Sequence, residues 1–142
     1  MSDTVNDEQF GHLTYDPHLD WWAGVVELPD EAGSKLYTHT PEEGGKAITQ
    51  QAREAFGIIA GSFDQIRQKA CDERLEIHNE SWNEGDPIDA ETFKRRLTLE
   101  SITLYPDGSA EIYFGDDDMF WGHAIIVSMS EEGGFTDAII AG

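Results

Sequence analysis

Three consecutive aspartates followed by a histidine are the side chains of this chain whose spacing comes nearest to a chemical site. Asp116, Asp117, Asp118 and His123 occur within the segment YFGDDDMFWGHAIIVSMS. Carboxylates and an imidazole in one segment could bind a metal ion or transfer protons. A hard cation needs about six oxygen ligands, however, and the segment lacks the glycine and the distal glutamate of a calcium loop. We therefore expect no metal ion and no cofactor here, and we interpret residues 115–118 as a loop between two paired strands.

The residues after the aspartates predict a strand in the middle of a sheet. From Met119 to Met129, apolar side chains occupy both alternating faces, which is typical of a strand covered on both sides and paired on both edges. Trp121 would then lie in the core. His123 would lie mid-strand among apolar neighbours, where a histidine is more often a hydrogen-bonded core residue than a ligand. Asp118 would face the other way, because it is an odd number of positions from His123.

A second group of polar and aromatic residues lies in the segment EIHNESW. Asn79, Glu80 and Trp82 follow a helical pattern, and with His123 they could line a pocket between the helices and the sheet. The segment also has a structural interpretation. His78 in the last turn of a helix complements the helix dipole, and Trp82 would close the core.

No standard catalytic motif occurs in the chain. It has no Gly-rich phosphate loop, no nucleophile elbow and no paired-histidine zinc motif. The single cysteine, Cys71, excludes an internal disulfide. Cys71 and His78 are seven positions apart and could share a helix face, but nothing marks an oxyanion hole beside them. An enzyme is therefore the less favoured interpretation.

The net charge is the most unusual global property of the chain. Nine Lys and Arg residues against 29 Asp and Glu residues give a net charge of −20 and a sequence pI of about 4.2. Such a charge disfavours binding to nucleic acid and to anionic membranes, because both need a basic surface. Two interpretations of the charge stay open. The acidic residues could meet a basic protein partner, or they could serve only solvation.

The compartment is predicted from what the sequence lacks. The first ten residues have neither the basic start nor the apolar core of a secretory signal, and no apolar run approaches the ~20 residues that span a bilayer. We expect a cytoplasmic protein that does not enter a membrane.

Hydrophobic periodicity predicts strands, then helices, then strands. Residues 10–16, 19–30 and 34–40 alternate as an antiparallel meander. Residues 46–78 repeat apolar side chains at helical steps, which predicts two helices in series or one kinked helix. Gly57 and Gly61 weaken the middle of this stretch, and Ser62 with Gln65 has the form of a capping box. A short helix with Asp89 as its N-cap and four further strands complete the chain.

These elements predict an α+β fold. We expect a largely antiparallel sheet of about six to seven strands, with two or three helices packed on one face. Residues 1–9 are polar and acidic, so we expect a disordered N-terminus there. Residues 10–142 are expected to form a single α+β domain.

Several segments together resemble one family. The stretches HNESW, FKRRLTLESITLYPDG and DDDMFWGHAIIV resemble the bacterial family catalogued as domain of unknown function 2262, over about residues 10–142. The most specific parts are Asn79, Glu80 and Trp82, and the run from Phe120 to His123. The resemblance implies a small bacterial protein with no established catalytic residues or cofactor.

The resemblance and the charge together suggest a function. Families of this kind are frequently immunity proteins found beside secreted toxins, and many such toxins are basic. We therefore expect a protein-binding module, with a cationic toxin as its partner, that acts through acidic residues outside the core. An enzyme or small-ligand binder is the alternative, and a charge that serves only solvation is another. The candidate binding residues are Asn79, Glu80, Trp82, Asp116, Asp118 and His123.

Overall fold

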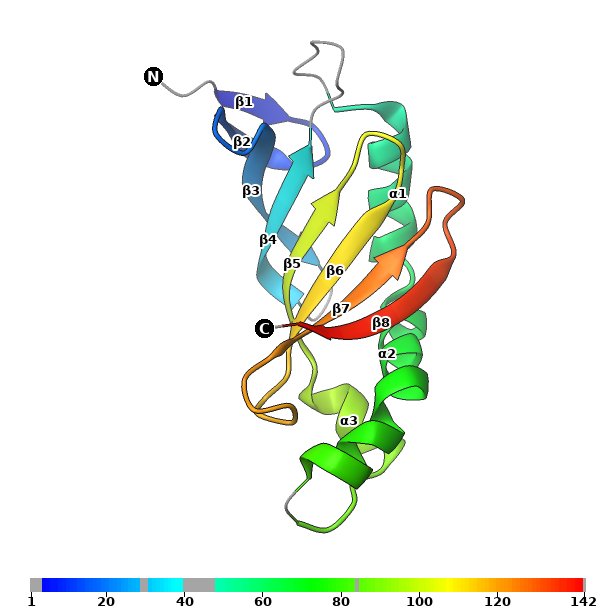
Figure 1. Cartoon of the computed structure of the whole chain (residues 1–142). Coiled ribbons are helices and arrows are strands. Elements are labelled where there is room, and N and C mark those ends of the chain that lie inside the picture. Colours follow the sequence, from blue (N-terminus) through cyan, green and yellow to red (C-terminus); the bar gives the residue numbers. More distant parts are fainter. Residues whose placement is uncertain (1–3, 29–30, 40–47, 84, 142) are drawn as a thin grey trace.

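The computed structural model describes residues 4–28, 31–39, 48–83 and 85–141, and within them it has one eight-stranded sheet (Figure 1). The strands follow one another across the sheet in chain order. They are β1 (Thr4–Asp7), β2 (Gly11–Asp16), β3 (Trp21–Leu28), β4 (Glu31–His39), β5 (Thr98–Leu104), β6 (Ala110–Gly115), β7 (Ala124–Met129) and β8 (Phe135–Ala141). Every neighbouring pair is antiparallel except β4 and β5, which are parallel.

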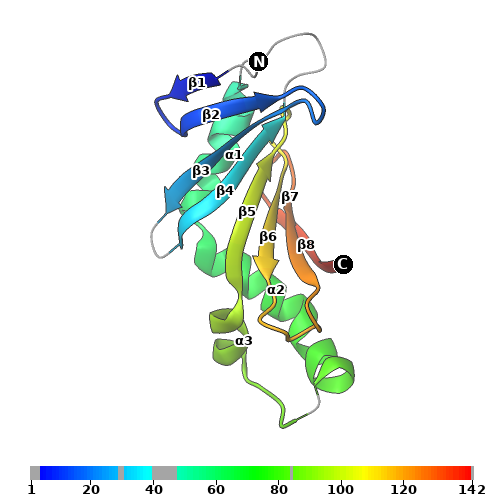
Figure 2. The same cartoon turned by 90° about the vertical axis from the view of Figure 1, so that its left-hand side faces the viewer.

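The helices all lie between β4 and β5 in the chain. They are α1 (Gln50–Ala60), α2 (Phe63–Ile77), a π-helical turn η1 (His78–Trp82) and α3 (Ala90–Arg96). A parallel pair of strands needs a long crossover connection, and this helical segment supplies it. Figure 2 shows the sheet in front of α1 and α2, so these helices cover one face. The core between the two layers includes Leu13, Leu36, Ile59, Ile66 and Ile112, all with no exposed surface.

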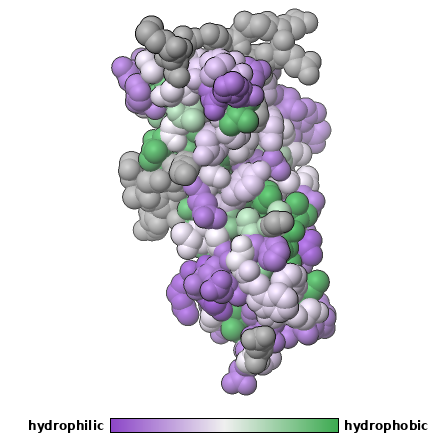
Figure 3. Space-filling model, turned by 60° about the vertical axis from the view of Figure 1, so that its left-hand side comes forward, coloured by the Kyte–Doolittle hydropathy of each residue, from purple (hydrophilic) through white to green (hydrophobic). Residues whose placement is uncertain are grey.

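The α+β class and the order of strands, helices and strands are confirmed, but the sheet has one or two more strands than expected. No helix among the described residues covers the second face of the sheet (Figure 2). Figure 3, which shows this face obliquely, has several separate hydrophobic areas among hydrophilic ones. The second face therefore presents no continuous apolar surface in this view.

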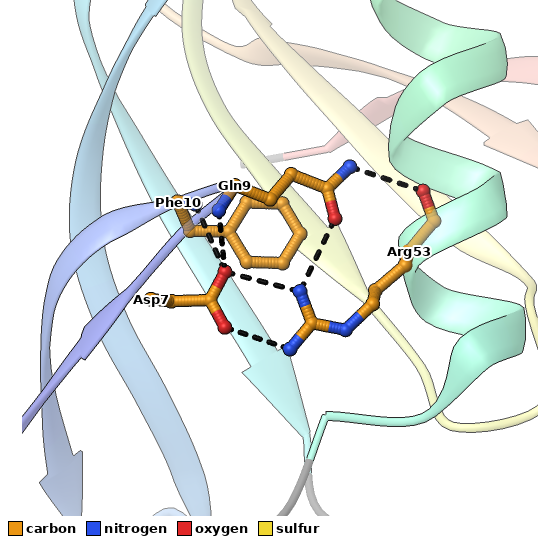
Figure 4. Close-up of polar contacts among 4 residues, drawn as sticks. All are labelled: Asp7, Gln9, Phe10 and Arg53. Atoms are coloured by element: carbon orange, nitrogen blue, oxygen red, sulfur yellow. Dashed lines mark hydrogen bonds and ion pairs between the residues drawn. The ribbon is translucent and has the colours of Figure 1, made fainter.

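The N-terminal segment differs from the expectation of disorder over residues 1–9. Thr4–Asp7 forms β1, which pairs with β2, while residues 1–3 lie outside the described residues. The carboxylate of Asp7 accepts hydrogen bonds from Arg53 Nη1 at 3.0 Å and from Arg53 Nη2 at 2.7 Å (Figure 4). It also accepts from the backbone N–H groups of Gln9 and Phe10. Arg53 belongs to α1, so this ion pair fastens the first hairpin to the helical layer.

The long helical stretch divides into two helices, as one of the two expectations had it. α1 ends at Ala60, and the N–H of Gly61 still donates to the carbonyl of Gly57. The expected capping box is wrong, because the side chain of Ser62 makes no capping hydrogen bond. The predicted N-cap of α3 is confirmed, since Asp89 Oδ1 accepts from the backbone N–H of Thr92 at 2.8 Å.

The predicted central strand is confirmed in its pairing and wrong in its start. β7 pairs with β6 on one edge and with β8 on the other. Its residues Ile125, Ile126 and Val127 are buried, so side chains on both faces of this strand are shielded from solvent. The strand begins only at Ala124, however, and the five preceding residues belong to the connection from β6.

Candidate functional site

The connection between β6 and β7, residues 116–123, is a loop organised around one buried carboxylate. Asp116 is 5% exposed. Its oxygens accept hydrogen bonds from the backbone N–H groups of Asp118 at 3.1 Å, Phe120 at 2.8 Å and Gly122 at 3.0 Å. These three bonds wrap the chain around Asp116. That wrapping explains why the alternating apolar pattern from Met119 does not continue a strand: its N–H groups bind a carboxylate and not a neighbouring strand.

The same loop holds Trp121 in an unusual conformation. Trp121 has a φ of 59°, in the left-handed region, and Asp117 and Asp118 have φ values of 47° and 61°. For a residue with a bulky side chain this region costs about 1–2 kcal/mol. Strain of this kind persists only where surrounding contacts determine the conformation, and it is concentrated at functional sites.

The expected burial of Trp121 is wrong. Its side chain is 61% exposed, whereas Phe120 beside it has no exposed surface and Met119 has 1%. The apolar residues of the loop therefore divide into two that enter the core and one that faces solvent. Left-handed backbone at Trp121 is what turns successive side chains in these different directions.

Trp121 lies in contact with the π-helical turn η1. Its ring centroid is 4.7 Å from that of Trp82, and its Nε1 donates to the Trp82 carbonyl at 3.2 Å. The Trp82 ring also contacts Phe120 and His123, with centroids 5.5 Å away in both cases. His123 is half-buried, and its Nδ1 lies 2.6 Å from the Phe120 carbonyl. We call Trp82, Trp121 and His123 the aromatic surface.

Carboxylates lie beside His123, at one side of the aromatic surface. A hollow of about 290 Å³ there is lined by Glu100, Gly115, Asp116, Asp117, Asp118, Gly122, His123 and Ala124. Asp117 forms an ion pair with Arg96 of α3, with 3.0 Å between Oδ2 and Nε. Asp118 and Glu100 are exposed, and we call these two residues the acidic rim. The β6–β7 connection lies at the end of the sheet nearest α3 (Figure 1).

The candidate residues of the helix end fall into two groups. Asn79 is structural: its Oδ1 accepts from the N–H of Ile88 at 3.1 Å and its Nδ2 donates to the Ile88 carbonyl at 3.0 Å. The buried His78 lies beside it, with 3.0 Å between its Nδ1 and the Asn79 Oδ1. Glu80 is exposed, and no hydrogen bond or ion pair joins it to His123. The structure thus brings Trp82 and His123 into contact. Neither Asn79 nor Glu80 forms an acid–base pair with His123.

The cysteine has the wrong environment for a nucleophile. Cys71 is buried, and burial together with the nearby Asp72 raises the pKa of its thiol, which disfavours the thiolate. Among the residues that the structure describes, no three His, Cys, Asp or Glu side chains are grouped in a way that could hold a metal ion.

Another hollow lies between α2, α3 and the start of β5. It has a volume of about 830 Å³ and a mixed-charge lining that includes Arg67, Lys94, Arg95 and Glu91. Arg67 donates to the carbonyl of Leu97 at 2.7 Å, and Lys94 pairs with Glu91 at 3.2 Å. Arg67 and Lys94 are therefore already bonded to groups of the chain at the end of α3, so we do not place a binding site there.

Sequence reasoning missed Arg96 and the exposure of Trp121. The Gly- and Asp-rich run 115–118 correctly predicted a loop but not its length. The available indication was Gly122, since a glycine shortly after an Asp-rich turn is typical of continued left-handed backbone, and Gly122 has a φ of 88°.

The comparisons with known proteins give one match. No curated protein matches the chain, and no solved structure matches it. In the described part of the chain, no helix combines the length and the apolar composition needed to cross a bilayer. The model of the family described as "Uncharacterized protein conserved in bacteria (DUF2262)" matches residues 7–140, and the chain therefore belongs to this family.

Proposed function

We propose that the protein binds a basic protein partner through the aromatic surface and the acidic rim. The observation that carries the proposal is Trp121, which is exposed to 61% although the loop holds it in a costly backbone conformation. Tryptophan is enriched among the residues that contribute most to protein–protein binding. A ring that is already fixed by Trp82 and by the Asp116 hydrogen bonds loses little freedom on binding.

Charge supports a basic partner. Glu100 and Asp118 flank the loop without an ion pair among the described residues, and the chain carries a net charge of −20. An Arg or Lys side chain of a partner could lie over the face of Trp121 and reach a rim carboxylate at the same time. The field of the whole protein would in addition accelerate the encounter with a cationic protein.

The biological role that fits best is inhibition of a cationic toxin, as an immunity-type protein. Membership of a bacterial family and the acidic charge support this role. The role needs no catalytic group, which agrees with the structural use of Asn79 and the lack of a hydrogen bond between Glu80 and His123. Binding rather than turnover is therefore the activity to test.

The experiment uses the wild-type protein, Trp121→Ala and the control Leu19→Ala as immobilised baits for lysate of the source bacterium. Leu19 is 52% exposed and lies between β2 and β3, away from the aromatic surface. The captured protein is identified, purified and measured by stopped-flow association at several salt concentrations. We expect wild type and Leu19→Ala to bind alike, and Trp121→Ala to bind at least about tenfold more weakly.

The salt series separates the two parts of the proposal. The association rate should fall as the Debye length decreases from about 10 Å at 0.1 M salt to about 3 Å at 1 M, while dissociation changes less. Undiminished binding by Trp121→Ala would remove the aromatic surface from the proposal. Association that ignores salt would assign the acidic charge to solvation. Loss of a small-molecule turnover in folded Glu80→Gln or His123→Gln would replace binding with the enzyme interpretation.

A further inference from the structure

The outer edge of β8 is covered at its middle by side chains of α2. A strand at the edge of a sheet presents unpaired N–H and C=O groups, to which another chain can add a strand. β8 pairs with β7 on one side, and Ala138 lies opposite Val127 in that pairing. Because β8 is the last strand of the sheet, its other side could in principle accept a ninth strand.

Two side chains of α2 occupy this position at the middle of β8. The N–H of Ala138 donates to Glu73 Oε1 at 2.9 Å, and the carbonyl of Ala138 accepts from Arg74 Nε at 2.6 Å. One acceptor and one donor thus meet the two outward backbone groups of a single residue, as a paired strand would. We call Glu73 and Arg74 the edge clamp.

The surroundings hold the edge clamp in place. Lys69, one turn earlier on α2, forms an ion pair with the second carboxylate oxygen of Glu73 at 2.8 Å. Ala138 has no exposed surface, and α2 packs against β8. A carboxylate with a fixed neighbour at each oxygen has little freedom to leave the edge.

We infer that the edge clamp prevents a second copy of this chain from adding its own β8 to the sheet. Two copies of one antiparallel edge strand can pair about a two-fold axis, and Ala138 lies at the middle of β8, where such an axis would pass. About an axis at Ala138, Ile139, which is 40% exposed, would lie opposite Asp137 of the second copy and diagonal to its Ile139. The net charge of −20 opposes the approach of two copies at low salt, but salt screens this long-range repulsion more strongly than the short contacts of the partly buried clamp.

The test is a double variant, Glu73→Ala with Arg74→Ala, compared with wild type and with the control Glu91→Ala with Arg95→Ala. Each double variant removes one acid and one base, so all three proteins keep a net charge of −20. Glu91 and Arg95 are exposed on α3, away from β8. Molar mass is followed by light scattering against protein concentration in 1 M salt, where the Debye length is about 3 Å. We expect the mass of the clamp variant alone to rise with concentration.

Hydrogen exchange reports the clamp directly. In the clamp variant the amide of Ala138 should exchange at least about tenfold faster, because it loses a hydrogen bond to a charged group. Glu73→Gln keeps an oxygen acceptor and should remain like wild type in mass. A folded clamp variant whose mass does not rise, or an unchanged exchange rate at Ala138, would overturn the inference. Should the double variant not fold, as judged by circular dichroism, Glu73→Ala alone is measured by the same two criteria.

Discussion

Trp121 lies against Trp82, with 4.7 Å between their ring centroids and a hydrogen bond of 3.2 Å from the Trp121 Nε1 to the Trp82 carbonyl. The Trp82 ring in turn contacts the fully buried Phe120, at 5.5 Å between centroids. Exposed and buried rings thus form one continuous aromatic group that joins the β6–β7 loop to η1. The two neighbouring positions 120 and 121 differ sharply in burial, which lets stability and binding be changed separately.

Replacing Phe120 should lower the stability of the fold strongly, whereas replacing Trp121 should lower it only a little. Phe120→Ala leaves a cavity in the core and should lower the free energy of unfolding by about 3–5 kcal/mol. Trp121→Ala removes a side chain that is 61% exposed, so its cost should stay below about 1 kcal/mol. Urea unfolding followed by far-UV circular dichroism measures both. A cost for Trp121→Ala as large as that for Phe120→Ala would mean that the ring supports the core.

The backbone strain at Trp121 predicts a difference between two small substitutions. The φ of 59° disfavours alanine as it disfavours tryptophan, whereas glycine adopts it freely. Trp121→Gly should therefore be more stable than Trp121→Ala by about 1 kcal/mol, although glycine ordinarily destabilises a folded chain relative to alanine. Chemical unfolding of the two variants side by side checks the sign. The reverse order would show that the loop relaxes out of the left-handed region once the ring is removed.

Asp116 should determine the order of the whole loop. Asp116→Ala leaves the N–H groups of Asp118, Phe120 and Gly122 without their common acceptor, and we expect a loss of roughly 1–3 kcal/mol. Asp116→Asn keeps one oxygen acceptor and should lose less. Hydrogen exchange at Phe120 and Gly122 is the local measurement. Exposed Asp118→Ala is the matched control, and equal exchange in both alanine variants would contradict the assigned role of Asp116.

The thiol of Cys71 should be unreactive in the native protein. Burial raises its pKa, and the neutral thiol is a poor nucleophile. Labelling with a thiol-specific disulfide reagent at neutral pH should be slow without denaturant and fast in urea. Rapid labelling of the folded protein would reopen the interpretation of Cys71 as a nucleophile.

The parts of the fold that follow from local patterns were predictable, and the parts that depend on distant partners were not. β2, β3, β5 and β6 alternate clearly, and the N-cap Asp89 is visible in the sequence because its partner is three residues away. β1 was missed because Thr4–Asp7 has one apolar residue, and its position depends on Arg53, 46 residues further along the chain.

The candidate site, too, could be predicted from the sequence only in part. Alternation of apolar residues from Met119 predicts a strand, but alternation carries no information on a buried carboxylate that takes three backbone hydrogen bonds. Trp82 and Trp121 are 39 residues apart, so their contact depends on where η1 and the loop meet. The residue types of the site were visible in the sequence, and the direction of each side chain was not.

The ion pair between Asp7 and Arg53 predicts a defined dependence of stability on pH. Hydrogen bonding to Arg53 lowers the pKa of Asp7 to about 2 from its ordinary value of 3.8. Because the pKa is lower in the folded state, the contribution of the ionised carboxylate is complete above about pH 4, decreases as the pH falls from about 4 to 2, and is lost below about 2. Since Arg53 is partly exposed, we expect this contribution to be about 1–2 kcal/mol.

Many other acids of the chain titrate over the same range, so the measurement is the difference in the free energy of unfolding between wild type and Asp7→Asn at each pH. This difference should be about 1–2 kcal/mol at pH 6 and should shrink below pH 4. In the Arg53→Met background, the difference that Asp7→Asn makes should be small at every pH. The stability of the Asp7 anion comes first from its hydrogen bond to Arg53, which this background lacks. Glu54→Gln, an exposed neighbour on α1, is the control and should leave the difference unchanged. A wild-type advantage that stays constant between pH 6 and pH 2 would show that Asp7 stabilises β1 through its shape and backbone hydrogen bonds and not through its charge.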